Sequence, residues 1–273
     1  MLNSAIISKK GLVGDRSFAL VEKSTGRIIS AKNPRKWKEV FNFSTKTLVS
    51  NENNDLLPKV SIEFADGETV LTDDENVNEI LSNKIGHSVS LVSEVPKNAM
   101  VEKLSLEDDE TEDSVSPVPL QKLSPFKFFD GGPLHLLTTD SLNKLKSIYR
   151  DGDFEPKRFR PNIVIDSADT GFDSKPILSL EQDCMLQIGD TVKLNFSKPT
   201  ERCIITTLAQ AGLPKDNKIL KTIDRANGGN LGFYTQTLEP GNVRVGDSIW
   251  MIGSRHPGFA LDTSPHEGDL ASV

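Results

Sequence analysis

The sequence is poor in the residues that form most metal and disulfide sites. It has only two cysteines among 273 residues, a count typical of a protein from a reducing compartment. Its four histidines are scattered, and the chain contains no HExxH pattern and no histidine–cysteine cluster. Two cysteines cannot build a zinc or iron–sulfur site unaided. We expect each histidine to be an ordinary surface or core residue: His87, His135, His256 and His266.

Long apolar runs and an excess of positive charge are also missing. No stretch approaches the roughly 20 consecutive apolar residues of a membrane-spanning helix, and the N-terminus lacks the basic and apolar segments of a secretion signal. With 32 basic and 39 acidic residues, the net charge of −7 disfavours binding to nucleic acid or to an anionic membrane. We therefore expect a cytoplasmic protein with neither of these partners.

Short segments of alternating apolar and polar residues, typical of strands, make up much of the chain. Val60 to Phe64 and Glu68 to Leu71 flank the turn Ala65-Asp-Gly67 and predict a hairpin. Residues 186–194 and 243–251 both place Gly-Asp between apolar runs, and each predicts a strand bent at its glycine. The sequence therefore predicts a mainly β fold with a few helices and a β-barrel architecture.

Composition also suggests where the domains begin and end. Residues 102–119 include Glu107-Asp-Asp-Glu110 and are too acidic and too poor in apolar residues to pack well, so we expect a linker there. It would separate an N-terminal domain over residues 1–101 from a second domain over residues 120–252. Residues 253–273 carry glycine, proline and polar residues, as expected of a C-terminal tail.

Cys203 is the strongest candidate for a reactive side chain. It follows Arg202 and precedes Ile204 to Thr207, so we expect a strand to begin almost at the thiol. A nearby guanidinium favours the thiolate, the form that attacks electrophiles and binds soft metals. The alternative is a small buried apolar residue, and local sequence does not decide between them. Cys184 has no basic neighbour, and we expect it to be a core thiol.

Four further runs could hold an anion or a heterocycle. Arg158-Phe-Arg-Pro-Asn162 offers two guanidiniums and an amide, and Ser30 to Trp37 groups three cations beside a tryptophan. Gly11 to Arg16 and Phe128 to Pro133 are glycine turns that could bring Arg16 or backbone amides close to a ligand. Surface ion pairs, solvated charges and simple turns explain the same runs equally well.

In order and spacing, these runs together resemble the MOSC superfamily. The resemblance rests on Gly11 to Arg16, Ser30 to Trp37, Asp130 to Thr138, Arg158 to Asp166, Arg202 to Thr207 and Pro240 to Met251. The chain is most similar to proteins that join an N-terminal MOSC β-barrel domain to a MOSC domain, such as the mitochondrial amidoxime-reducing component and the YcbX type. This resemblance implies a MOSC-type β-barrel plus a smaller N-terminal β-barrel-like domain.

The resemblance also implies a cofactor and the residues that bind it. Molybdopterin would carry a molybdenum ion coordinated by Cys203, which would be both metal ligand and catalytic residue. Arg16 matches a residue that contacts the cofactor phosphate. The loop near the pterin corresponds to Asp130, Gly131 and Gly132. Arg160 and Asn162 match the arginine and asparagine that hold the cofactor.

The function implied is the reduction of N-hydroxylated compounds, such as hydroxylaminopurines or amidoximes. This chain lacks the cysteine-rich ferredoxin extension of YcbX-type proteins, so electrons would come from a separate reductase. A first strand that contributes to phosphate binding in the family is also apparently missing before Met1. Two alternatives stay open: a sulfur carrier that holds a persulfide on Cys203, and a non-catalytic module that binds the cofactor.

Overall fold

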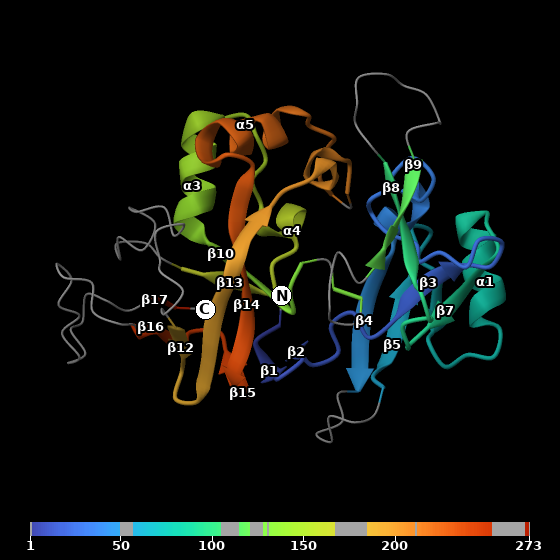
Figure 1. Ribbon diagram of the computed structural model, residues 1–273, viewed down its shortest axis with the longest axis horizontal. Helices are drawn as coiled ribbons and strands as arrows, with labels where there is room; N and C mark the ends of the chain where they lie inside the picture. Colours follow the sequence, from blue (N-terminus) through green and yellow to red (C-terminus); the bar gives the residue numbers. More distant parts are fainter. Residues whose placement is uncertain are drawn as a thin grey trace. The chain divides into compact units, whose positions relative to one another are not determined.

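The computed structural model of the chain describes most of its residues, in two compact units (Figure 1). The described residues are 2–49, 57–104, 115–120, 128–129, 131–166, 185–210, 212–252 and 271–272. What we call the C-terminal unit comprises Met1–Val13, Gly131–Ala209 and Leu213–Val273, and the N-terminal unit comprises Gly14–Asp130 and Gln210–Gly212. Strands predominate over helices, which confirms the predicted fold class.

The C-terminal unit contains most of the long strands and three of the α-helices. Its strands are β1 (Ser4–Ser8), β2 (Gly11–Leu12), β10 (Leu134–Thr138), β11 (Ile163–Ile165), β12 (Met185–Ile188), β13 (Val192–Glu201), β14 (Asn230–Glu239), β15 (Gly241–Arg244), β16 (Ser248–Ile252) and β17 (Ala271–Ser272). Its helices are α3 (Thr139–Ile148), α4 (Pro156–Phe159) and α5 (Lys218–Asn227), with the 3-10 helix η4 (Ile204–Thr207).

Two sheets enclose the main core of this unit. Seven strands pair in the order β11-β10-β14-β13-β12-β16-β17, and three more pair as β15-β1-β2. All neighbours are antiparallel except β10 and β11. Ile7 of β1 and Val243 of β15 pack in the same buried cluster as Leu136 and Leu186 of the large sheet. Apolar residues from both sheets therefore share one core.

Alternation along β10 places helices on the other face of the sheet. Leu136 faces the core between the sheets, whereas the next residue, Leu137, packs in a second cluster with Leu145 of α3 and Ile219 of α5. Successive side chains of a strand point to opposite faces, and all five residues of β10 are buried, so the sheet is covered on both sides here. Figure 1 shows α3 and α5 side by side at the end of this sheet.

The two Gly-Asp segments differ from the prediction. Each one forms a turn between two strands, whereas a bend within a single strand was expected. Gly189 and Asp190 connect β12 to β13, and Gly246 and Asp247 connect β15 to β16. Both glycines have positive φ angles, 54° and 92°. The left-handed region is accessible to glycine at little cost and is typical of tight turns. The repeated pattern therefore marks two chain reversals.

In the part of the N-terminal unit that the structure describes, the elements are short strands, a 3-10 helix and the α-helix α1. Its elements are β3 (Ala19–Glu22), the 3-10 helix η1 (Lys38–Asn42), β4 (Ser44–Val49), β5 (Lys59–Glu63), β6 (Thr69–Leu71), α1 (Val77–Ile85), β7 (Val89–Val92), β8 (Met100–Leu104) and β9 (Val115–Pro119). Strands β5 and β6 form the predicted hairpin. Trp37, Ile62, Phe64 and Leu81 lie in its main apolar cluster.

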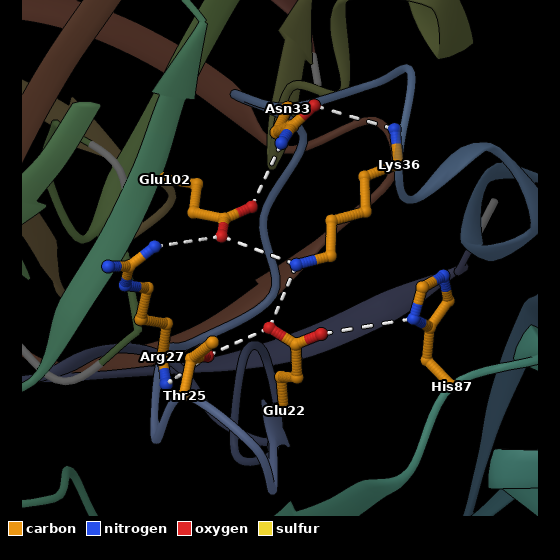
Figure 2. A network of polar contacts seen from close by, with 7 residues as sticks. All are labelled: Glu22, Thr25, Arg27, Asn33, Lys36, His87 and Glu102. Atoms are coloured by element: carbon orange, nitrogen blue, oxygen red, sulfur yellow. Dashed lines mark hydrogen bonds and ion pairs between the residues drawn. The ribbon is translucent and has the colours of Figure 1, made fainter. Parts of the chain in front are cut away.

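A polar network ties the Ser30 to Trp37 segment to two buried carboxylates (Figure 2). The Lys36 Nζ lies 2.8 Å from Glu22 Oε2 and 3.3 Å from Glu102 Oε1. Arg27 also contacts Glu102, at 3.1 Å, and Asn33 donates to it at 2.9 Å. Lys36, one of the cations that we considered for phosphate binding, is therefore engaged within its own unit.

In the sequence, the two units are divided after Val13 and after Asp130, and residues 210–212 belong to the N-terminal unit. Residues 102–104 belong to β8 and residues 115–119 form β9, which pair with each other, whereas residues 105–114 lie outside the described part. The first thirteen residues pack in the C-terminal unit because β1 pairs with β15. Most of the predicted tail over residues 253–273 also lies outside the described residues. Within the described residues, no helix is both long and apolar enough to cross a membrane.

Candidate functional site

Cys203 lies on the surface immediately after the long strand β13. Its side chain is exposed, which rules out the alternative of a small buried apolar residue. Its backbone is extended, with φ −115° and ψ 177°, and it forms the N-cap of η4. The thiol is therefore presented where a strand ends and a tight helical turn begins.

The prediction of a strand beginning at Cys203 is wrong, because residues 204–207 form η4. Threonine hydroxyls explain the difference. The Thr206 hydroxyl donates to the Cys203 carbonyl oxygen at 3.0 Å, and the Thr207 hydroxyl donates to that of Ile204 at 2.7 Å. Such local bonds compete with strand pairing for the same backbone groups. The strand was predicted from the apolar and β-branched character of residues 204–207, which does not indicate these hydroxyl bonds.

Arg158 holds the segment that follows Cys203. This side chain is completely buried. Its guanidinium donates to the carbonyl oxygens of Thr206 at 3.1 Å and Leu208 at 3.4 Å, and to that of Pro214 at 3.1 Å. Its Nε donates to the Asp153 carbonyl oxygen at 2.8 Å. Arg158 therefore fixes the backbone around η4.

Arg160, the second arginine of the same run, is placed differently. It caps the C-terminus of α4 in the left-handed region, with φ 55° and ψ 48°, and it is exposed. A non-glycine residue in this region is uncommon and is stabilised by its surroundings. Its N–H donates to the Pro156 carbonyl oxygen at 3.1 Å. The two guanidiniums thus point to different environments, and Arg160 is the one at the surface.

Arg202 links the strand that precedes Cys203 to α4. Its Nη2 donates to the Phe159 carbonyl oxygen at 2.9 Å, and its guanidinium carbon lies 5.7 Å from the centre of the Phe159 ring. Its backbone N–H donates to the Gly229 carbonyl oxygen at 2.8 Å. Because Arg202 and Arg158 both bridge the two segments, Cys203 and Arg160 are held in neighbouring parts of the structure.

Asn162 is bound to the start of β10. Its backbone N–H donates to the His135 carbonyl oxygen at 2.8 Å, and its Oδ1 accepts the His135 N–H at 2.9 Å. This pair extends the parallel ladder of β10 and β11 by one step. These two bonds fix the Asn162 side chain against the start of β10.

His135 is a residue that the sequence prediction missed. It is buried, with 4% of its surface exposed. Its Nε2 lies 3.4 Å from both the Leu231 carbonyl oxygen and Arg202 Nη1. When Nε2 carries a proton it donates to Leu231, and when it does not, it accepts from Arg202. The prediction that His135 is an ordinary core histidine holds for its burial, but its neighbours place it beside the predicted site.

The glycines of the Asp130-Gly-Gly loop have a packing role. A Cβ on Gly131 would lie 2.3 Å from Tyr234 Cε2, and one on Gly132 would lie 2.8 Å from the Tyr234 Cβ. A Cβ on Gly11 would lie 2.6 Å from the Pro133 carbonyl oxygen. The Tyr234 ring also lies 5.7 Å from that of His135. The loop is therefore packed closely against β14 and β2, for which only glycine is small enough.

Two of the predicted residues, Arg16 and Asp130, are not part of the C-terminal unit. Arg16 belongs to the N-terminal unit, where it pairs with Asp15 and its guanidinium carbon lies 5.4 Å from the centre of the Phe129 ring. Asp130 lies outside the described residues. The contacts of Arg158, Arg202 and His135 link the other predicted residues within the C-terminal unit: Gly131, Gly132, Arg160, Asn162 and Cys203. We refer to these five as the Cys203 site.

Comparison with known proteins points to a MOSC domain. Residues 124–250, a little under half of the chain, match the family model of the MOSC domain. MOSC domains are generally associated with binding or sulfuration of the molybdenum cofactor. The matched region includes the whole Cys203 site. No curated protein matches this sequence.

Two of the solved structures that match are distant from this chain. YiiM from Geobacillus stearothermophilus is 17% identical, with 46% of this chain and 57% of that chain covered and a TM-score of 0.33. This chain therefore spans less than two thirds of the length of YiiM. The YuaD protein from Bacillus subtilis is 15% identical, with 55% of this chain and 78% of that chain covered and a TM-score of 0.38.

Proposed function

We propose that the protein binds a molybdopterin cofactor at the Cys203 site and uses it to reduce N-hydroxylated compounds. The observation that carries this proposal is the exposed Cys203 thiol, held between β13 and η4 inside the region that matches the MOSC domain. A thiolate is the protein ligand that a soft metal prefers. An exposed, fixed thiol can bind a metal that arrives with the rest of its ligands on a cofactor.

The residues around Cys203 suit such a group. Arg160 is exposed and can pair with a phosphate, for which a guanidinium is well shaped. Asn162, by the family resemblance, is the second residue that would hold the cofactor. Arg158 and Arg202 keep these residues in place through bonds to backbone carbonyl oxygens, the support that a precise ligand site needs. By the family resemblance alone, Arg16 and Asp130 are also expected to contact the cofactor.

In the overall reaction, R–NHOH takes up two electrons and two protons and gives R–NH2 and water. When bound, the cofactor supplies the two-electron chemistry that removes the oxygen. The protein's own part is to hold the cofactor through Cys203 and the site arginines. The electrons come from a separate reductase.

Metal analysis of Cys203 variants tests the proposal. The full chain is produced in cells that make molybdopterin, and bound molybdenum is measured for the parent, Cys203→Ala and the matched control Cys184→Ala. We expect the molybdenum content of Cys203→Ala to be at most about a tenth of that of the parent. The molybdenum content of Cys184→Ala should equal that of the parent. Turnover of benzamidoxime with reduced methyl viologen should follow the molybdenum content. Equal molybdenum in both variants would refute the ligand role of Cys203.

The exposure of Cys203 also suits a sulfur carrier, in which the thiol holds a persulfide for delivery. Cyanolysis of the freshly purified protein, followed by measurement of thiocyanate, distinguishes the two functions. Labile sulfur that disappears in Cys203→Ala, in a protein without molybdenum, would favour the carrier. Bound molybdenum without turnover of any N-hydroxylated substrate would favour a non-catalytic cofactor-binding module.

A further inference from the structure

A cluster of positive charge lies where α3 ends and α5 begins. Residues 139–151 and 218–227 carry six lysines and arginines and three carboxylates, although the whole chain has a net charge of −7. Four of these cations are exposed around the junction of the two helices: Lys146, Arg150, Lys218 and Lys221. Ile148 lies between them in the sequence, with 54% of its surface exposed. We call these five residues the basic patch.

Tyr149 joins the two halves of the basic patch. The Lys218 Nζ lies 5.4 Å from the centre of the Tyr149 ring, so the end of α3 and the start of α5 meet at this side chain. Burial and a hydrogen bond to Asp216 raise the pKa of Tyr149 above its ordinary value. Asp216 is thereby held by a hydrogen bond within its own unit. The exposed carboxylates nearest in sequence are Asp151 and Asp224.

A row of packed aromatic rings leads from the basic patch towards Cys203. Tyr149 and Phe154 have ring centres 6.3 Å apart, and those of Phe154 and Phe159 are 6.4 Å apart. The Arg202 guanidinium carbon lies 5.7 Å from the centre of the Phe159 ring, and Arg202 directly precedes Cys203. In addition, α5 packs against η4, which follows Cys203. The basic patch is therefore linked to the Cys203 site through contiguous side chains.

We infer that the basic patch is the docking surface for an acidic electron-carrier protein. This inference rests on the proposed function, in which a separate protein supplies two electrons to the site. Complementary charge speeds and orients such an encounter. Exposed arginine and apolar side chains within a charged rim are typical of protein interfaces. A long polyanion such as nucleic acid would extend beyond the basic patch and be repelled by the negative charge on the rest of the chain. A small acidic protein can contact the basic patch alone.

Charge reversal on α5 tests the inference. Lys218→Glu with Lys221→Glu inverts the charge, and glutamate in the first turn of a helix is favourable, so the fold should be retained. The matched control is Lys23→Glu with Lys97→Glu, two exposed lysines of the N-terminal unit. The probes are an acidic plant-type [2Fe–2S] ferredoxin and an acidic flavodoxin. Binding of the full chain to each is measured by calorimetry at low and at high salt.

We expect at least one probe to bind, with the α5 double variant weakening Kd on the order of tenfold at low salt and the control leaving it unchanged. High salt should reduce the difference. The inference is overturned if neither probe binds, if both double variants behave alike, or if the same lysines instead govern binding to phosphatidylserine vesicles or to nucleic acid. Turnover with reduced methyl viologen, measured separately, reports on the proposed function without any protein donor, so the two can fail independently.

Discussion

At the scale of single residues, a charged side chain in the interior supports a thiol at the surface. Arg158 is completely buried, and its hydrogen bonds run to backbone carbonyl oxygens of four residues. Removing the guanidinium leaves these oxygens, of which the one of Thr206 is buried, without these donors. An unsatisfied buried polar group costs more than an average hydrogen bond contributes.

Arg158→Met should therefore lower the free energy of unfolding by about 2–4 kcal/mol. Chemical denaturation followed by fluorescence measures the change. Arg160→Met is the control from the same run, and because Arg160 is exposed we expect a change within about 0.5 kcal/mol. Similar losses in the two variants would show that the buried bonds of Arg158 do not stabilise the Cys203 site.

At the scale of elements, the close approach of β10 and β14 shapes the interior next to the site. Gly232 of β14 has a φ of 81°, and a Cβ at this position would lie 2.5 Å from the Leu136 carbonyl oxygen and 2.4 Å from His135 Nε2. The first of these atoms belongs to the backbone of the paired strand and cannot move away freely. The pairing of these two strands therefore requires a glycine at position 232.

Gly232→Ala should destabilise the protein by about 2–4 kcal/mol, through the strained φ and the clash together. Gly228→Ala separates the two effects, because Gly228 also has a positive φ, 55°, but no atom within 4 Å of its added Cβ. Its expected cost is about 1 kcal/mol. Thermal unfolding of both variants gives the comparison, and equal costs would mean that strand crowding contributes nothing.

At the scale of the whole molecule, stability should depend on pH through the network in Figure 2. Burial raises the pKa of Glu22, but hydrogen bonds from Lys36 and Thr25 outweigh it and bring the pKa below the ordinary 4.5. For Glu102, burial is likewise outweighed by bonds from Asn33, Arg27 and Lys36, and its pKa is also lowered. His87 lies on the other side of Glu22, with Nδ1 3.8 Å from Oε1.

A carboxylate whose pKa is lower in the folded state stabilises the fold above its unfolded pKa and loses that effect as pH falls through its folded pKa. The unfolding temperature should therefore drop as pH falls below about 4.5. Glu102→Gln should lower the unfolding temperature at pH 7 and flatten the acid limb. Glu94→Gln, an exposed residue, serves as the control and should retain the full acid dependence. If the unfolding temperature of Glu102→Gln fell with pH as steeply as that of the parent, Glu102 would not be a source of the acid dependence.

Some of the site could be predicted from the sequence, and the remainder depended on contacts between distant residues. The run Arg158 to Asn162 was recognisable as a cluster of polar groups. Its division into a buried arginine and an exposed one follows from the turn at Arg160, which local sequence does not specify. His135 and Tyr234 carry no motif. Their place beside the site results from the pairing of β10 with β14, across about a hundred residues of chain.

By itself, the sequence determined the mainly β class, the β5–β6 hairpin and Cys203 as the candidate reactive residue, because periodicity, turn residues and composition act locally. Only the tertiary structure decided that Cys203 is exposed, that η4 replaces the expected strand, that the Gly-Asp segments are turns, and that residues 1–13 join the C-terminal unit. The physical reason is the same in each case. These outcomes depend on which distant groups accept or donate the backbone hydrogen bonds, and a linear pattern does not record the partner.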